Sequence, residues 1–210
     1  MLIQNQVGPI ASTSSIASGT QVTNRAGNMG EGIISELHGR YYEACYRRSI
    51  FSAANTAAVA TVAQGTLANT GLTLSNPVGS TVNLVLLKCS YVNSVAVPTA
   101  GYLALETGFN AGTNVTHTVA ATIANQFIGV GASGTGLADT SATHPTAAVH
   151  RLGLAHLGTL AVTGYGVLPY NVVDLEGSII LPHGAYCAFY TFATNTAAWF
   201  FSFTWEEVPV

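Results

Sequence analysis

Residues 197–207 read AAWFFSFTWEE. Every second residue from position 199 is a large aromatic, which places four of them on one face of an extended chain: Trp199, Phe201, Phe203 and Trp205. This period of two predicts a β-strand with one buried face, because successive side chains of a strand point to opposite sides. Two tryptophans and two phenylalanines on one face require a second sheet to cover them. The run therefore predicts a β-sandwich.

The segment just before this run is also aromatic. Residues 186–192 read YCAFYTF, and the short linker Thr194-Asn195-Thr196 separates them from the strand. We expect the two segments to form a hairpin in the central sheet.

Short strand patterns separated by turn residues fill the rest of the chain. Strands are expected at residues 36–51, 72–74, 82–97, 102–106 and 174–181, whereas residues 53–65 suit a helix or a strand. Residues 129–145, GVGASGTGLADTSATHP, are expected to form a long loop. No alternation of strands and helices appears, so the pattern indicates an all-β fold, an antiparallel β-sandwich or jelly roll.

The first 36 residues differ from the remainder. They are rich in Ser, Thr, Asn and Gly with isolated apolar residues, and cannot form a core alone. We expect an extended N-terminal arm over residues 1–36, followed by a sandwich domain over residues 37–210. The arm would lie along a neighbour in an assembly, the alternative being a tail without a role.

Charge is scarce in this chain. Charged residues make up 7% of it and the formal net charge is -3, against about 25% charged residues in an average soluble domain. A free monomer usually keeps a charged surface, so the composition favours a surface covered by partners over an ordinary secreted domain. Six scattered Lys and Arg residues argue against binding of nucleic acid.

Three cysteines, Cys45, Cys89 and Cys187, stand far apart. An odd number without a CxxC pair predicts free thiols, not a disulfide framework or a zinc site. The N-terminus lacks the basic and apolar regions of a secretory signal, and no apolar run reaches membrane-spanning length. We therefore expect neither secretion nor a membrane partner.

Motifs of chemistry are weak. Gly129, Gly131 and Gly134 spell GxGxxG without a helical pattern behind them, so a flexible loop explains them better than a dinucleotide site. His144, His150 and His156 are spaced by six and would share a face on one strand, where a threefold axis could gather one from each chain around a metal. Hydrogen-bonded histidines are the simpler reading.

No constellation for catalysis is evident. The chain has Ser, His and Asp but no GxSxG elbow, and the adjacent Glu206 and Glu207 would point to opposite faces of a strand. We expect no enzyme, no catalytic residues, no cofactor and no metal. The loop tyrosines Tyr165 and Tyr170 would suit a carbohydrate platform.

Two segments resemble virion proteins of tailed bacteriophages: residues 35–43, SELHGRYYE, and the stretch from Leu175-Glu176-Gly177 to Trp205-Glu206-Glu207. The chain is similar in particular to the small β-sandwich or jelly-roll proteins that decorate or cement the capsid. Such proteins commonly form trimers on the capsid lattice and bind neighbouring major capsid proteins. The similarity extends over most of the body as a polar arm followed by an Ala/Thr/Gly-rich all-β domain.

This resemblance implies a structural virion protein on the capsid surface, made in the host cytoplasm, that stabilises the shell as a homotrimer. Its partner would be the major capsid protein. Six charged residues are the candidates for contacts between subunits or with the shell: Arg25, Glu36, Arg40, Glu43, Arg47 and Arg48. The alternative is the head of a tail fibre that binds host glycan through residues 129–145 and 165–170.

Overall fold

The computed structural model describes residues 39–95, 98, 100–131, 134–157 and 171–210. The chain divides into two units, Met1–Glu43 and Ala44–Val210, and every strand belongs to the second. The expected arm over residues 1–36, with Arg25 and Glu36, lies outside the described residues, as does the loop with Tyr165 and Tyr170.

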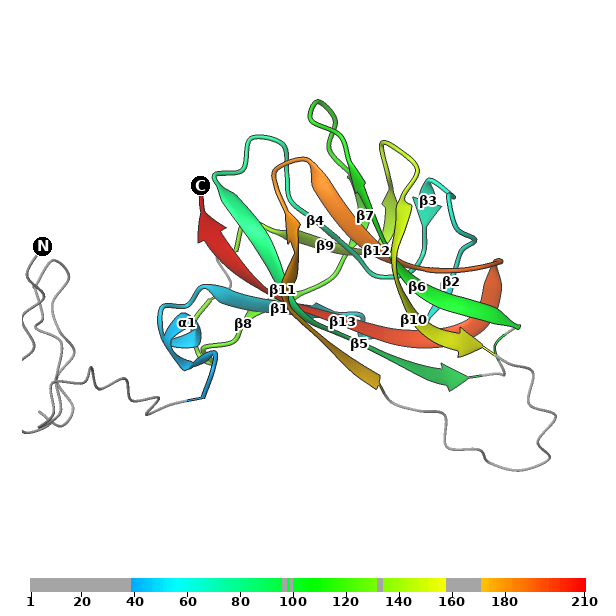
Figure 1. Cartoon of the computed structure of the whole chain (residues 1–210), viewed down its shortest axis with the longest axis horizontal. Helices are drawn as coiled ribbons and strands as arrows, with labels where there is room; N and C mark the ends of the chain where they lie inside the picture. Colours follow the sequence, from blue (N-terminus) through cyan, green and yellow to red (C-terminus); the bar gives the residue numbers. More distant parts are fainter. Residues whose placement is uncertain (1–38, 96–97, 99, 132–133, 158–170) are drawn as a thin grey trace, which may run out of the picture. The chain divides into compact units, whose positions relative to one another are not determined.

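The second unit is a sandwich of two antiparallel sheets, one of six strands and one of seven (Figure 1). The first sheet has the order β11 (Asn171–Leu181), β5 (Val82–Val95), β13 (Asn195–Pro209), β1 (Ile50–Ala54) and β8 (Ile123–Asn125), with β2 (Val59–Thr61) also paired to β13. The second has the order β10 (Val149–Leu157), β6 (Gly101–Phe109), β12 (Ala185–Thr191), β4 (Thr73–Ser75), β9 (Leu137–Thr143) and β3 (Ala68–Asn69), with β7 (Thr116–Ala120) paired to β9. The predicted all-β sandwich is confirmed.

The connections between the sheets are those of a jelly roll. Eight strands form the frame, in chain order β1, β4, β5, β6, β10, β11, β12 and β13. Numbered one to eight, they give the orders 1-8-3-6 in the first sheet and 2-7-4-5 in the second. This interleaving is that of the eight-stranded double Greek key, in which nearly every connection crosses from one sheet to the other.

An insertion between β6 and β10 extends both sheets at one side. Its strand β8 pairs with β1 at the margin of the first sheet, and its strand β9 pairs with β4 in the second. The predicted long loop over residues 129–145 is therefore wrong in part, because β9 occupies residues 137–143. Its short Ala, Thr and Ser side chains hid the strand, since they provide little apolar alternation.

The core confirms the alternation of residues 197–207. The four aromatic side chains Trp199, Phe201, Phe203 and Trp205 are at most 3% exposed. Phe189 of β12 stacks on Phe201 and Phe203 of β13, with ring centroids 4.2 and 4.7 Å apart. These stacked rings join one sheet to the other.

The expected hairpin between residues 186–192 and the final strand is wrong. β12 pairs with β4 and β6, whereas β13 pairs with β1, β2 and β5. The aromatic faces of the two strands pack against each other across the sandwich instead of lying side by side in one sheet. Face-to-face packing buries both faces, which pairing in one sheet would not do.

The expected strand over residues 36–51 is also wrong over most of its length. The helix α1 (Tyr42–Tyr46) precedes β1, because Tyr42 and Tyr46 are four apart and suit one helical face as well as an alternating strand. The Ser49 amide donates to Ala44 O at 3.1 Å and the Arg48 amide to Cys45 O at 2.9 Å. With Arg48 at φ 63°, this is the Schellman ending of a helix.

Proline and glycine favour a turn directly after β4. After β4 the chain turns through Pro77 and Gly79, where the Ser80 amide donates to Pro77 O at 3.1 Å and Gly79 has φ 85°.

Cys89 and Cys187 are buried and Cys45 is half-buried, and all three are free thiols.

Candidate functional site

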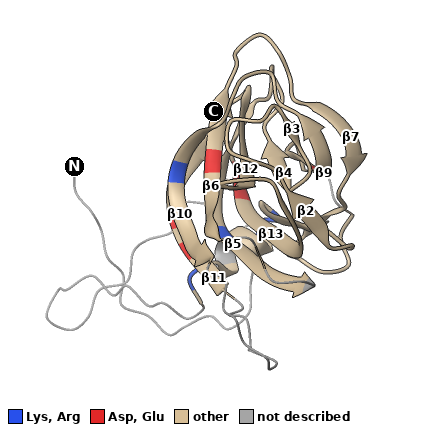
Figure 2. Cartoon of the chain, turned by 90° about the vertical axis from the view of Figure 1, so that its right-hand side faces the viewer, with Lys and Arg blue, Asp and Glu red and all other residues tan. Residues whose placement is uncertain are grey.

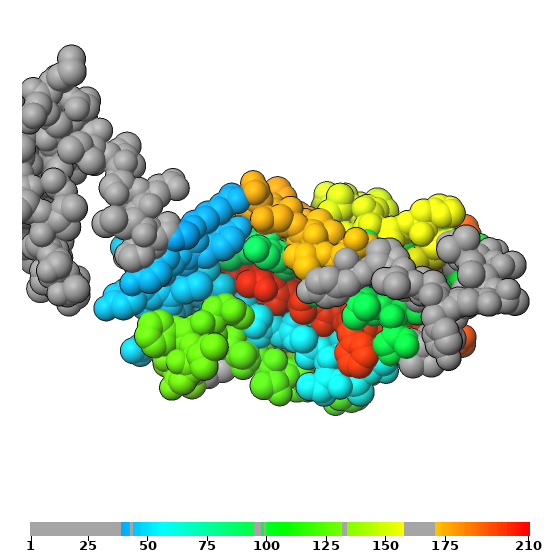
Figure 3. Space-filling model, turned by 90° about the horizontal axis from the view of Figure 1, so that it is seen from below, coloured from blue at the N-terminus to red at the C-terminus, as the bar shows by residue number. Residues whose placement is uncertain are grey.

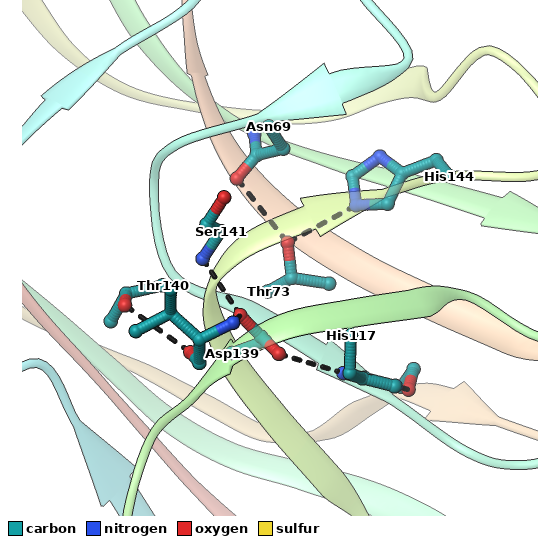
Figure 4. A network of polar contacts seen from close by, with 9 residues as sticks. Asn69, Thr73, His117, Asp139, Thr140, Ser141 and His144 are labelled. Carbon is teal, nitrogen blue, oxygen red and sulfur yellow. Dashed lines mark hydrogen bonds and ion pairs between the residues drawn. The ribbon is translucent and has the colours of Figure 1, made fainter.

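A network of polar contacts lies on the outer face of the second sheet (Figure 4). Three neighbouring strands, β7, β9 and β4, bring its lower half together (Figure 4). A residue from each strand contributes: His117 from β7, Asp139 from β9 and Ser75 from β4.

Asp139 is the anchor of this half. Its side chain is fully buried, and its Oδ1 accepts hydrogen bonds from the Val119 amide at 2.9 Å and the Ser141 amide at 2.7 Å. The register between β7 and β9 shifts on both sides of Val119, so the carboxylate takes the place of ladder acceptors at the bulge. Asp139 thus fixes β7 to β9.

His117 lies between the carboxylate and a serine. Its Nδ1 is 3.3 Å from Asp139 Oδ2, and its Nε2 is 3.1 Å from Ser75 Oγ. The histidine thus contacts a serine through one ring nitrogen and a buried aspartate through the other, which is the arrangement of contacts in acyl-transfer triads. Ser75 and His117 are 42 residues apart, and Asp139 lies on a third strand, so no local motif marks them.

The geometry favours a structural role over a catalytic one. Ser75 is 3% exposed, which denies a substrate access to its hydroxyl. His117 Nδ1 and Asp139 Oδ2 are close, but the contact does not have hydrogen-bond geometry, so the histidine is not oriented as a general base. The three residues instead connect β7 and β9 to β4 through the Ser75–His117 contact and the two amides bound to Asp139 Oδ1.

The upper half of the network centres on His144, which is 1% exposed. Its Nε2 is 3.1 Å from Thr73 Oγ1 and its Nδ1 is 2.7 Å from the Tyr190 hydroxyl. Thr73 Oγ1 donates to Asn69 Oδ1 at 3.2 Å, so the Thr73 oxygen accepts from His144 Nε2–H. In this tautomer the Tyr190 hydroxyl would donate to His144 Nδ1, but the Thr66 carbonyl lies 3.0 Å from the same hydroxyl and competes for its single proton.

His144 is held neutral. Burial, aided by the nearby His117, lowers its pKa from 6.5 to about 4. Its ring also stacks on Tyr186, with centroids 4.1 Å apart. A neutral imidazole with a hydroxyl beside each ring nitrogen is a packing element and not a free ligand for a metal.

A second buried carboxyl, Glu106 of β6, lies on the same outer face. It is fully buried and neither oxygen has a hydrogen-bond partner among the described residues. Burial raises its pKa from 4.5 to about 7, and the nearby Gly65 amide, whose contact falls short of hydrogen-bond geometry, acts in the opposite direction. Burial chiefly, and Glu106 in addition, raise the pKa values of Tyr186 and Tyr190.

The three histidines expected on one face do not converge. His144 precedes β10, whereas His150 and His156 lie on that strand, with two register shifts between them. His150 is exposed and packs edge-on against Tyr102 at 5.6 Å. No group of three metal-binding side chains occurs in the part of the chain that the structure describes.

The other sequence candidates also lie apart from the network. The GxGxxG segment leads into β9 and not into a helix. The Glu206 carboxylate accepts from Ser49 Oγ, whereas Glu207 accepts from the Thr135 and Gly136 amides. The two glutamates therefore have different partners, which agrees with the expectation that they point to opposite faces of the strand.

Of the candidate contact residues, Arg40 belongs to the first unit and Arg47 and Arg48 to the second. Arg40 is exposed and its guanidinium lies 5.4 Å from the Tyr41 ring centroid. Arg47 and Arg48 are exposed, and Arg48 lies 5.6 Å from the centroid of Phe127. The structure does not describe the side chain of Glu43. Their role as subunit contacts stays a prediction.

No protein-family model matches the chain, and no curated protein or solved structure matches it significantly. Among the described residues, no helix is long and apolar enough to cross a membrane. Fold and site together define the class: a jelly-roll sandwich whose second sheet carries a buried polar network.

A substitution at Asp139 tests the structural role. We expect Asp139→Ala to lower the free energy of unfolding by about 2–4 kcal/mol, because two buried amides lose their acceptor, while Asp139→Asn, which keeps one oxygen, should cost less. Chemical denaturation measures both. Labelling of Ser75 by a fluorophosphonate probe above the level of Ser75→Ala would contradict this role and indicate an acyl-transfer site.

Proposed function

We propose that the chain is a non-enzymatic structural protein of a bacteriophage particle, which decorates and cements the capsid as a homotrimer by binding neighbouring major capsid proteins. The observation that carries this proposal is the outer face of the first sheet. That face is broad and mostly uncharged, since the strands of the first sheet carry five charged residues, Lys88, Asp174, Glu176, Glu206 and Glu207. A surface that stays in water usually carries more charge.

Small polar and apolar side chains line this face. Along β13 the residues that alternate with the buried aromatics are half-buried: Ala198, Phe200, Ser202, Thr204 and Glu206. Val172 and Ile180 of β11 are 50% and 53% exposed, and Lys88 is the only basic residue of β1, β5, β11 and β13. Figure 3 looks onto this face, with β13 in red along its middle.

Two hydroxyls of this face bond to each other. Ser90 of β5 and Ser202 of β13 share a hydrogen bond of 2.6 Å between their hydroxyls. A pre-ordered surface with few charges loses little side-chain entropy and little charge solvation when another protein covers it. Several such contacts made by one trimer would multiply the effective affinity for a lattice.

The jelly-roll topology supports the proposal as a fold used by shell proteins, although the same fold serves lectins and cupins as well. The glycan-binding alternative depended on residues 129–145 and 165–170. The second segment is outside the described residues, and the first is partly the strand β9. Because β9 leaves less of residues 129–145 as a loop, and the first sheet has a mostly uncharged outer face, we favour the cement function.

Light scattering at several protein concentrations tests the proposal first, with a stable trimer as the expected result. Deletion of residues 1–36 should then abolish binding to shells of the cognate phage while the trimer stays folded. A stable monomer, or undiminished binding by the truncated chain, would contradict the trimeric cement function and its arm respectively.

A further inference from the structure

A groove of about 630 Å³ lies between the first half of β10 and the second half of β11. The end of β6 and the start of β12 form its floor, with Thr107, Phe109 and Ala185 among the lining residues. It lies at the edge where the two sheets stay open, beside the last strand of each. Residues 158–170 connect the opposite ends of these strands.

The walls of the groove are partly apolar and partly polar, and three of the apolar lining side chains reach solvent. Phe109 is 55% exposed and Val149 59%, and Ile180, which also borders the outer face of the first sheet, is 53% exposed at the rim of the groove. Three large apolar side chains exposed around one groove form a patch of the kind that marks an interaction site.

Arg151 is the one Lys or Arg side chain among the residues that line the groove. The Nε of Arg151 donates to Thr107 Oγ1 at 2.6 Å, and among the described residues no carboxylate pairs with its guanidinium. Arg151 is the only basic residue of β10, and Figure 2 shows the blue segment of that strand on this side of the sandwich. The remaining N–H donors of its guanidinium suit a carboxylate.

The bounding strands can accept a short extended segment but not a long flat one. Within the described residues β10 pairs only with β6, and β11 only with β5. β10 has two register shifts, and β11 bulges at Glu176 and Gly177, with φ 51° and 80°. Bulges of this kind prevent sheet-to-sheet pairing along a whole edge.

We propose that residues 31–37, EGIISEL, of a neighbouring copy bind this groove in an extended conformation. Glu31 and Glu36 are the only acids of the first 38 residues, and they flank the pair Ile33-Ile34. An extended chain presents Ile34 and Glu36 on one side, about 7 Å apart. Ile34 packs against Phe109, Val149 and Ile180, and the Glu36 carboxylate pairs with Arg151.

This inference rests on the proposed oligomer and says how its subunits are connected: residues 31–37 of each copy bind the groove of the next copy. Such head-to-tail contacts close a ring when the rotation between copies allows it. Residues 158–170 contain no acidic residue, so they have no side-chain carboxylate to pair with Arg151.

Cysteine cross-linking in the full chain tests the contact. In a Cys45→Ser background, two differently tagged chains are co-expressed, one with Ile34→Cys and the other with Val149→Cys. We expect a disulfide-linked heterodimer on non-reducing gels, several-fold above the control pair Ser14→Cys with Val149→Cys. Arg151→Glu should reduce the yield about fivefold, as loss of a strong surface ion pair would, and Glu36→Arg added to Arg151→Glu should restore it.

The outcomes separate the inference from the function on which it rests. A trimer by light scattering without cross-linking above the control overturns the arm contact and leaves the oligomer standing. A disulfide formed only within one chain that carries both cysteines overturns the choice of a neighbouring copy. A monomer at every concentration overturns the oligomer, and the arm exchange with it.

Discussion

Replacing Glu106 with glutamine is expected to flatten the dependence of stability on pH. The folded pKa of Glu106 is about 7 and its ordinary value 4.5, so the folded state keeps a proton that the unfolded chain releases between these values. Stability from this group is therefore unaffected below pH 4.5, falls as the pH rises to 7, and stays low above it. The 2.5-unit difference corresponds to about 3 kcal/mol at most.

The surroundings of Glu106 explain why the penalty is large. Tyr186 and Tyr190 of β12 lie beside the carboxyl and their pKa values are raised, so they are neutral across this range. His150 stands opposite Glu106 in the register with β10 but is exposed. No described group forms an ion pair with Glu106, and a buried carboxylate without a partner is costly.

Urea denaturation at pH 5 and at pH 8.5 measures the effect. The wild type should lose about 2–3 kcal/mol between the two, and Glu106→Gln much less. Glu176→Gln is a suitable control, because Glu176 is exposed on β11, and it should follow the wild type. A Glu106→Gln profile as steep as that of the wild type would mean that Glu106 is not the group that titrates.

Replacing Phe203 with alanine is expected to cost about 3–5 kcal/mol of unfolding free energy, as for other buried aromatics. Phe203 is fully buried and stacks on Phe189 of the opposite sheet at 4.7 Å. Its removal leaves a cavity between the sheets and also ends an aromatic contact, itself about 1 kcal/mol. A loss of this size is a large part of the stability of a domain.

Phe200 provides the matched control on the same strand. It is half-buried on the outer face of the first sheet, so Phe200→Ala should cost less than about 1 kcal/mol in the free protein. Thermal and chemical denaturation of both variants measures the difference. Equal losses would contradict the assignment of the two faces, and a larger loss at Phe200 only in the oligomer would support a covered outer face.

The faces of the strands were predictable from sequence because alternation is a local property. Trp199, Phe201, Phe203 and Trp205 are buried as their spacing predicts. The turn at Pro77 and Gly79 follows from the conformations these residues favour. The all-β class follows as well, since no helical periodicity interrupts the strands.

The partners of each strand were not predictable in this way. β12 and β13 are neighbours in sequence, yet they lie in opposite sheets. Alternation says which face of a strand is buried but not whether a sheet neighbour or an opposing sheet buries it. At Tyr42 and Tyr46 the spacing suits both helix and strand, and the left-handed Arg48 settles the helix end.

The candidate site was decided by tertiary structure alone. Ser75, His117 and Asp139 are unremarkable in sequence, and they meet because an insertion after β6 returns to pair beside β4. The burial of Glu106 likewise depends on what covers the outer face of β6. Sequence by itself determined the strands and their apolar faces, which depend on neighbouring residues; the pairing of distant strands decided the polar network, the buried carboxyl and the groove at Arg151.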